Sequence, residues 1–230
     1  MTPFAPVPRI LEDLRAGRMI VLLDAPDREN EGDLVIAAEK ITPALVNFVR
    51  TEARGEFSVA LASEICERLH LSPQVAENTS KHATAFTVTV DARRCIDNGV
   101  SVEDLALTAR LLARPGTAPN DLVRPGHVHP IRAREGGVLV RTGQTEGSVD
   151  LARMAGLNPA AVIVEILAAD GRMARGARLT AFARRHKLRM CRVSDVIAYR
   201  RRKEKLVTRT LTLDLPTEAG PFTLHVYRTP

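Results

Sequence analysis

The chain has 230 residues, of which 45% are hydrophobic and only 3% aromatic, with no tryptophan. A chain of this size can bury a substantial core as one domain, and leucine, valine, isoleucine and alanine must build that core. No apolar run approaches the roughly 20 residues that a membrane-spanning helix needs, and the N-terminal segment lacks the basic-then-apolar order of a signal peptide. We therefore expect a cytoplasmic protein that does not act in a membrane.

A formal net charge of +6 raises the question of nucleic-acid binding. Much of the excess lies in two C-terminal clusters, 184–187 and 200–203, where stacking aromatics are nearly missing. Solvated helix ends, or attraction of phosphorylated substrates, explain these clusters better than nucleic acid does. The cysteines Cys66, Cys95 and Cys191 are odd in number and widely spaced, which argues against a disulfide framework and against structural zinc.

Short helices and short buried strands alternate along the first half of the chain. Apolar spacing, β-branched content and Pro or Gly punctuation identify them. In chain order we predict a helix over 7–14, strands over 19–23 and 34–38, a helix from 42 to about 55, a strand over 59–62, a helix that Ser63 caps, a strand over 85–90, and a helix from a capping box at Ser101 to about 114.

The second half continues the alternation after a segment rich in Pro and Gly. The predicted elements are an ordered loop over 115–130, strands over 137–141 and 161–167 with a helix around 149–155 between them, a helix near 180–186, a strand over 189–193 and a helix over 195–202. Such alternation predicts an α/β or mixed α+β domain. From Glu204 onward, alternating apolar and polar residues predict an appended antiparallel hairpin.

The most informative segment for chemistry is the loop DRENEGD at 27–33, which lies between two predicted strands. It carries four acidic side chains, and carboxylates at this density repel one another unless a cation, a base or water relieves them. Hard divalent cations prefer such oxygen ligands, and Arg28 offers a fork for a phosphate or a neighbouring acid. A solvated acidic turn is the alternative from composition alone.

Three other segments carry candidate chemistry. His127, between Gly and Pro residues in RPGHVHP, is a plausible general acid or base, although two alternate histidines also suit a plain surface. The segment RTGQTEG at 141–147 leads into a helix, where N–H groups, Thr hydroxyls and an Arg form a phosphate cradle. Glu165 interrupts the apolar run AAVIVEIL and is either a functional carboxylate with a perturbed pKa or an edge residue facing water.

These segments together resemble the 3,4-dihydroxy-2-butanone 4-phosphate synthases of riboflavin biosynthesis. The matching pieces are DRENEGDLVIAAE, NTSKHATAFTVTVDA, RPGHVHPIRAREGGVLVRTGQTEGSVDLARMAG, AAVIVEI and DGRMAR, which cover roughly residues 7–202 in the family's order. The resemblance implies a three-layer α/β domain with a mixed twisted sheet that works as a homodimer. It also implies a Mg²⁺-dependent (or Mn²⁺-dependent) lyase that converts the sugar phosphate D-ribulose 5-phosphate into 3,4-dihydroxy-2-butanone 4-phosphate and formate.

The resemblance also implies roles for single residues. Those implied for substrate binding are Arg28, Asp33 and the phosphate segment Arg141, Thr142, Gly143 and Thr145. Those implied for catalysis are His127, Glu165 and Glu31, the last as part of the acidic loop, and those implied for the metal are Glu29 and Gln144.

The sequence departs from the family pattern at three of its motifs. Gln144 stands where the family's GHTE motif has a metal-binding His, and it offers a neutral amide oxygen without a titratable group. Ser58 stands where many members have Cys. Leu105 stands where an Arg is common, and in an anion-binding pocket this change would remove charge and forked hydrogen bonds.

The tail from Glu204 resembles the beginning of a GTP cyclohydrolase II domain. We therefore predict a synthase-like domain over 1–203 and a tail over 204–230 that is a remnant without cyclohydrolase activity. Besides an active synthase, two functions stay open at this point: a sugar-phosphate enzyme repurposed for a specialised pathway, and an impaired paralogue that binds a ligand or partner.

Overall fold

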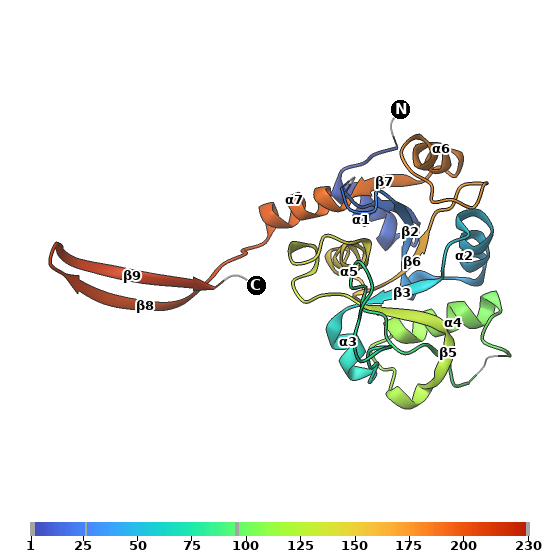
Figure 1. The fold of residues 1–230 in the computed structure, drawn as a ribbon, viewed down its shortest axis with the longest axis horizontal. Coiled ribbons are helices and arrows are strands. Elements are labelled where there is room, and N and C mark those ends of the chain that lie inside the picture. The colour runs from blue at the N-terminus through green and yellow to red at the C-terminus, as the bar shows by residue number, and fades with distance from the viewer. Residues whose placement is uncertain (1–2, 26, 95–96, 229–230) are drawn as a thin grey trace. The chain divides into compact units, whose positions relative to one another are not determined.

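The computed structural model describes residues 3–25, 27–94 and 97–228, and Figure 1 shows its fold. The chain divides into two compact units, Met1–Val196 and Ile197–Pro230. Within the described residues, the first unit holds a seven-stranded sheet of order β4-β5-β3-β6-β2-β1-β7. Its strands are β1 (Ile20–Leu23), β2 (Gly32–Ala37), β3 (Ser58–Leu61), β4 (Val90–Ala92), β5 (Leu122–Arg132), β6 (Ala160–Glu165) and β7 (Arg189–Arg192).

Helical segments connect these strands, except β1 and β2, which the acidic loop joins. The α-helices are α1 (Val7–Arg15), α2 (Pro43–Phe48), α3 (Ser63–Arg68), α4 (Val102–Ala113), α5 (Gln144–Met154), α6 (Ala177–Arg185) and α7 (Val193–Lys203). Shorter turns are η1 (Ala38–Lys40), the π-helix η2 (Val49–Ala53), η3 (Pro119–Asp121) and η4 (Gly137–Leu139). Among the described residues, no helix is long and apolar enough to cross a membrane.

The sheet is mixed, because β2 pairs antiparallel with β1 and β6 whereas β1 pairs parallel with β7 and β3 parallel with β5. A Cβ on Gly147 of α5 would contact Leu22 of β1, and a Cβ on Gly32 would contact Val21 of β1 and Leu179 of α6. Adjacent strand residues point to opposite faces, so α5 and α6 cover opposite faces. The predicted three-layer domain with a mixed sheet is confirmed.

Aliphatic side chains form the core, as the composition predicts. Every residue of β2 is buried, and in β1 only Leu23 is partly exposed. Strands covered by helices on both faces read as continuous apolar runs, which is why the runs at 19–23 and 34–38 identify them correctly. The helix at 7–14, the helix from Thr42 and the elements from 161 to 202 are likewise found close to their predicted places.

The loop predicted over 115–130 is wrong, because this segment contains η3 and most of β5. The pairing of β4 with β5 shifts its register between Val90 and Asp91, which marks a bulge. Gly126 permits a close backbone approach, since a Cβ there would lie 2.0 Å from the Val90 carbonyl carbon. Pro and Gly mark a strand irregularity here rather than a loop.

The strand predicted over 137–141 is also wrong, because the segment forms η4. Gly137 has φ +62, and a Cβ there would lie 2.3 Å from the Asp150 carboxylate oxygens. That carboxylate accepts the N–H of Val138 at 2.9 Å. A helix side chain thus holds the backbone in a tight turn that local propensity does not reveal.

Two further predictions need correction. Ser63 is the first residue of α3 rather than its cap, and its hydroxyl donates to the Ala133 carbonyl at 3.0 Å. Of the strand predicted over 85–90, only Val90 belongs to β4, while Phe86 and Thr87 form isolated bridges. The cap at Ser101 is confirmed, since its hydroxyl accepts the N–H three residues on at 3.1 Å.

The second unit contains the predicted hairpin, formed by β8 (Thr208–Thr217) and β9 (Gly220–Arg228). Three leucines of β8 face three apolar residues of β9. The cross-strand pairs are Leu211–Val226, Leu213–Leu224 and Leu215–Phe222. Residues two apart on a strand share a face, so these six side chains form one apolar face, and all six are exposed.

Candidate active site

Arg28 is the centre of the acidic loop. Its Nη1 atom lies 2.8 Å from Asp24 Oδ2, 2.6 Å from Glu29 Oε2 and 2.9 Å from Gln144 Oε1. The side chain of Arg28 is 16% exposed, so these contacts form in a partly buried setting. Three oxygens from two distant segments therefore meet at one cationic nitrogen.

Asp24, at the end of β1, organises the loop. Its side chain is fully buried, and its two carboxylate oxygens accept the N–H groups of Glu29 at 3.1 Å and Glu31 at 2.9 Å. Arg28 supplies the countercharge. A buried carboxylate needs such partners, and they hold the backbone so that the acidic side chains after it are presented in a defined order.

Asp33 and Glu165 form a carboxyl pair across the central strands. They are direct partners in the antiparallel register of β2 and β6, so their side chains lie on the same face. Burial raises the pKa of Asp33 well above its ordinary value, and the negative charges of Glu165 and Glu29 raise it further. Burial likewise raises the pKa of Glu165. Glu165 therefore does not face water at an edge.

Glu31 is the third carboxyl with a raised pKa, again mainly because of burial, although Arg175 opposes the shift. Arg175 Nη2 lies 2.5 Å from Glu31 Oε1, and its Nε donates to the Glu29 carbonyl at 3.1 Å. Arg175 comes from the segment DGRMAR after β6. The acidic loop is thus braced on one side by Gln144 and on the other by Arg175.

The phosphate segment ends at the N-terminus of α5, with Gly143 as its N-cap. Arg141 Nη1 pairs with Glu146 Oε2 at 2.7 Å, and its Nη2 donates to the His82 carbonyl at 3.1 Å. A Cβ on Gly143 would lie 2.5 Å from Arg141 Nη1. Thr145 is buried and Thr142 is exposed. The predicted helix start with an adjacent arginine is therefore present.

His82 connects the two halves of the site. Its Nε2 lies 3.5 Å from Glu29 Oε1, while its carbonyl accepts from Arg141. A chain of direct contacts thus runs from Gln144 through Arg28, Glu29 and His82 to the phosphate segment.

His127 lies apart from this chain of contacts. It is on β5, which β3 separates from β6 and Glu165. Its Nδ1 lies 2.7 Å from Asp91 Oδ2, and its backbone N–H donates to Asp91 Oδ1 at 2.9 Å. Asp91 is 4% exposed, whereas the His127 side chain is 51% exposed. The buried carboxylate thus anchors a histidine whose other ring nitrogen points away from it.

The donor set at Arg28 fits a hard divalent cation. Glu29 and Gln144 each direct an oxygen to the same point, and Mg²⁺ prefers oxygen ligands, with one or two carboxylates and the remainder from water or substrate. Among the described residues, no group of three or more His, Cys, Asp or Glu is placed to hold a metal ion. Two protein ligands, one of them an amide oxygen, are what this site would contribute.

Sequence reasoning missed several residues of the site. The missed side chains are Asp24, His82, Asp91, Glu146 and Arg175. His82, Asp91 and Arg175 lie within the segments that carry the family resemblance, which was the available signal. Asp24 ends a predicted strand next to the acidic loop, and this position is itself a hint.

The model of the 3,4-dihydroxy-2-butanone 4-phosphate synthase family matches residues 8–199. The chain belongs to this family. It is 48% identical over 227 residues to the riboflavin biosynthesis protein RibBA of Aquifex aeolicus, covering 98% of this chain and 56% of that protein. It is 44% identical to the 3,4-dihydroxy-2-butanone 4-phosphate synthase of Neisseria meningitidis serogroup B, covering 99% of this chain and 62% of that protein.

The chain spans about half the length of the curated RibBA relatives that it matches. Among solved structures, the two-domain synthase RibBX of A. baumannii superposes with a TM-score of 0.90 at 42% identity, covering 98% of this chain and 66% of that one. A synthase in complex with two magnesium ions superposes with a TM-score of 0.83 at 40% identity, covering 87% of this chain and 98% of that one.

The structure locates the three departures from the family pattern. Gln144 is 6% exposed and contacts Arg28 directly, so it belongs to the site. Ser58 begins β3 and is buried between His129 of β5 and Ile163 of β6 in the sheet register. Leu105 is 4% exposed on α4 and is part of the apolar core, so its side chain is accounted for by packing.

Proposed function

We propose that this chain converts D-ribulose 5-phosphate into 3,4-dihydroxy-2-butanone 4-phosphate and formate, with Mg²⁺ (or Mn²⁺) as its cofactor. The single observation that carries the proposal is that oxygens of Glu29 and Gln144 converge on one cationic nitrogen of Arg28. The Asp33–Glu165 pair is near this point, because the charge of Glu29 adds to burial in raising the pKa of Asp33 and the pKa of Glu165. Family membership, and the magnesium complex of a solved relative, support the same reading over a repurposed or impaired paralogue.

The phosphate segment would hold the substrate at its phosphate end. The N–H groups at the start of α5 attract anions, and Arg141 is kept in place by Glu146 and the His82 carbonyl. Thr142, Gly143 and Thr145 complete this segment, and Arg28 and Asp33 are the substrate-binding residues in the acidic loop. Positioning of this kind turns substrate binding energy into alignment of the reacting carbons.

Glu29 and Gln144 would hold the metal ion. When bound, Mg²⁺ supplies Lewis-acid stabilisation of negative charge on substrate oxygens.

Proton transfer falls to carboxyls with raised pKa values and to His127. A carboxyl whose pKa is raised binds a proton more readily, which suits it to general acid or base work nearer neutral pH. Glu165 and Glu31 are the two that we assign to catalysis. Asp91 would keep His127 Nδ1 occupied, so that Nε2 is the nitrogen offered to substrate. The overall reaction balances in carbon, hydrogen, oxygen and phosphorus without added water or oxidant.

The decisive test is Mg²⁺-dependent release of formate from ribulose 5-phosphate by the purified chain, followed with formate dehydrogenase. We expect one formate per four-carbon phosphate, and loss of activity on removal of divalent metal. Glu29→Gln keeps the shape of the side chain and removes the charge, so turnover should fall at least about 100-fold. Glu64→Gln, an exposed residue paired with Arg153, is the matched control. Sugar-phosphate binding without formate would overturn the proposal.

We further propose that the chain forms a homodimer and acts in the cytoplasm, and that residues 1–203 form the synthase domain while 204–230 resemble the start of a GTP cyclohydrolase II domain. The family match over residues 8–199 supports this division. Light scattering on the eluting protein should return twice the mass of one chain. A monomer at micromolar concentration with full activity would contradict the dimer.

A further inference from the structure

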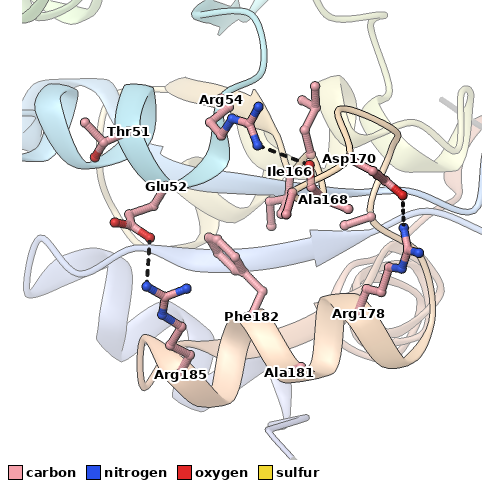
Figure 2. A pocket seen from close by; sticks show the side chains of 13 residues that line it. Thr51, Glu52, Arg54, Ile166, Ala168, Asp170, Arg178, Ala181, Phe182 and Arg185 are labelled. Carbon is pink, nitrogen blue, oxygen red and sulfur yellow. Dashed lines mark hydrogen bonds and ion pairs between the residues drawn. The ribbon is translucent and has the colours of Figure 1, made fainter.

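A cavity lies beside α6. Its volume is about 630 Å³, and its walls come from η2, the segment after β6, and α6 (Figure 2). Glu165 belongs to the candidate active site, and the next residue, Ile166, lines the cavity. Adjacent residues of an extended chain point to opposite faces. Glu165 and Ile166 therefore project to opposite faces of the sheet.

One face of α6 supplies a ring and two cations. Arg178, Phe182 and Arg185 follow the spacing i, i+4, i+7, which places them on one side of a helix. Figure 2 shows the Phe182 ring between the two arginines and directed toward the segment after β6. Ile166 and Ala168 lie opposite the ring. The floor of the cavity is thus apolar and includes an aromatic surface.

An unusual backbone segment supplies a third cation. Arg54 follows the last residue of the π-helix η2 as its C-cap, and its φ of 68 lies in the left-handed region. That conformation is uncommon for a residue with a side chain, and π-helices are rare and often found at functional sites. Arg54 Nη1 donates to the Ala168 carbonyl at 3.2 Å, which holds its guanidinium at the cavity.

The acidic partners at the rim are weakly bound. Arg178 pairs with Asp170 at 3.0 Å and Arg185 with Glu52 at 3.9 Å, and the arginine side chains are 59% and 76% exposed. Exposed pairs contribute little free energy, so an incoming anion can replace them. The lining carries three arginines against two acids. Arginine forks match phosphate oxygens in a bidentate manner.

We propose that this cavity binds a small aromatic phosphate monoester, with its ring against Phe182 and Ile166 and its phosphate on the rim arginines. Both the apolar floor and the rim arginines are needed to select this ligand. An apolar floor alone would bind a neutral ring, and exposed arginines alone would bind free phosphate.

Phenyl phosphate is the probe, titrated into the chain by calorimetry and by ¹H–¹⁵N spectra. The titration is done in an Arg141→Gln background, so that binding at the proposed substrate phosphate segment does not interfere. We expect phenyl phosphate to bind at least tenfold more tightly than inorganic phosphate or phenol. The double variant Arg178→Gln/Arg185→Gln should weaken binding at least tenfold. Arg184→Gln, on the exposed side of the same helix, is the matched control and should leave binding unchanged.

Ala181→Trp provides a second test, because it fills the cavity without removing charge. It should abolish binding of phenyl phosphate while the far-ultraviolet spectrum and the thermal midpoint stay close to those of the parent. Equal weakening by Arg184→Gln would show general attraction to a basic helix and overturn the proposal. Equal binding of phenol would show that the phosphate is not recognised, and undiminished binding in Ala181→Trp would show that the ligand lies elsewhere.

Discussion

The pairing of His127 with Asp91 makes a sharp prediction about how the histidine works. Asp91 Oδ2 lies 2.7 Å from His127 Nδ1, and Oδ1 accepts the His127 N–H at 2.9 Å. An ionised carboxylate can only accept hydrogen bonds, so Nδ1 must carry a proton and Nε2 is the nitrogen left to accept one. In Asp91→Asn, the amide oxygen can keep the backbone contact, but the NH₂ group then faces Nδ1. This favours the opposite tautomer.

The expected loss follows from what is removed. If His127 serves as general base, presenting a protonated Nε2 to substrate should lower turnover by about 10²–10⁴-fold, the usual contribution of a positioned acid or base. KM should change little, because the predicted phosphate contacts lie at α5. Stability should fall by about 1–3 kcal/mol, since Asp91 is 4% exposed and its charged hydrogen bonds are weakened.

Formate release gives the rates, and ¹H–¹⁵N long-range spectra of the imidazole nitrogens report the tautomer directly. His129 and Glu56 form a matched pair, also at 2.7 Å, but the Glu56 side chain is 59% exposed. Glu56→Gln should therefore cost less than about tenfold in turnover, because water can replace the lost partner. Retention of turnover in folded Asp91→Asn, or an unchanged tautomer, would refute this reasoning.

Three other predictions concern the metal, the carboxyl pair and the fold. Gln144→Ala should weaken Mg²⁺ binding about tenfold or more in calorimetry, and equal Mg²⁺ affinity in this variant would exclude the amide oxygen as a ligand. Gln144→His should shift the preference toward Zn²⁺ or Ni²⁺, because imidazole suits these metals. Burial and the charge of Glu165 raise the pKa of Asp33. The contribution of Asp33 to stability is therefore present below the unfolded pKa of about 3.9 and is lost as pH rises through the folded pKa. Asp33→Asn should raise the urea midpoint more at about pH 8 than at about pH 5, and an equal change at both pH values would contradict the raised pKa. Gly126→Ala should lower the free energy of unfolding in urea by about 2–3 kcal/mol or more, because the new Cβ would lie 2.0 Å from a backbone carbon. Gly116→Ala should change this free energy by less than about 0.5 kcal/mol, because nothing lies within 4 Å of its Cβ position.

Buried periodic segments could be predicted from sequence, and segments that depend on distant partners could not. The runs of β1 and β2 are apolar because helices cover both faces of the sheet, so local composition reports their burial. The turn at Gly137 depends on Asp150 of α5, and β5 depends on a bulge opposite Gly126. Neither partner is visible in a local window.

The residues of the candidate site fall into the same two groups, those recognisable from local sequence and those that depend on a distant partner. Residues concentrated in one motif, such as Glu29 and Glu31, were identified from their density and from the family resemblance. Asp91 and His82 were not assigned roles, because each acts through a contact with a residue far along the chain: Asp91 with His127, and the His82 carbonyl with Arg141. A single sequence without such distances shows which residue types are present, but not which of them hold the others in place.

Asp24 explains how one cluster can serve both a guanidinium and a metal ion. Arg28 shares Glu29 and Gln144 with the proposed cation, and two positive charges at one point would repel each other. Asp24 is a partner of Arg28 that the proposed metal set does not include, and backbone N–H groups hold its carboxylate in place whatever Arg28 does. Arg28 can therefore yield two oxygens and keep a buried countercharge. Because position 144 carries a neutral amide, Glu29 is the charged side chain for which Arg28 and the proposed cation would compete.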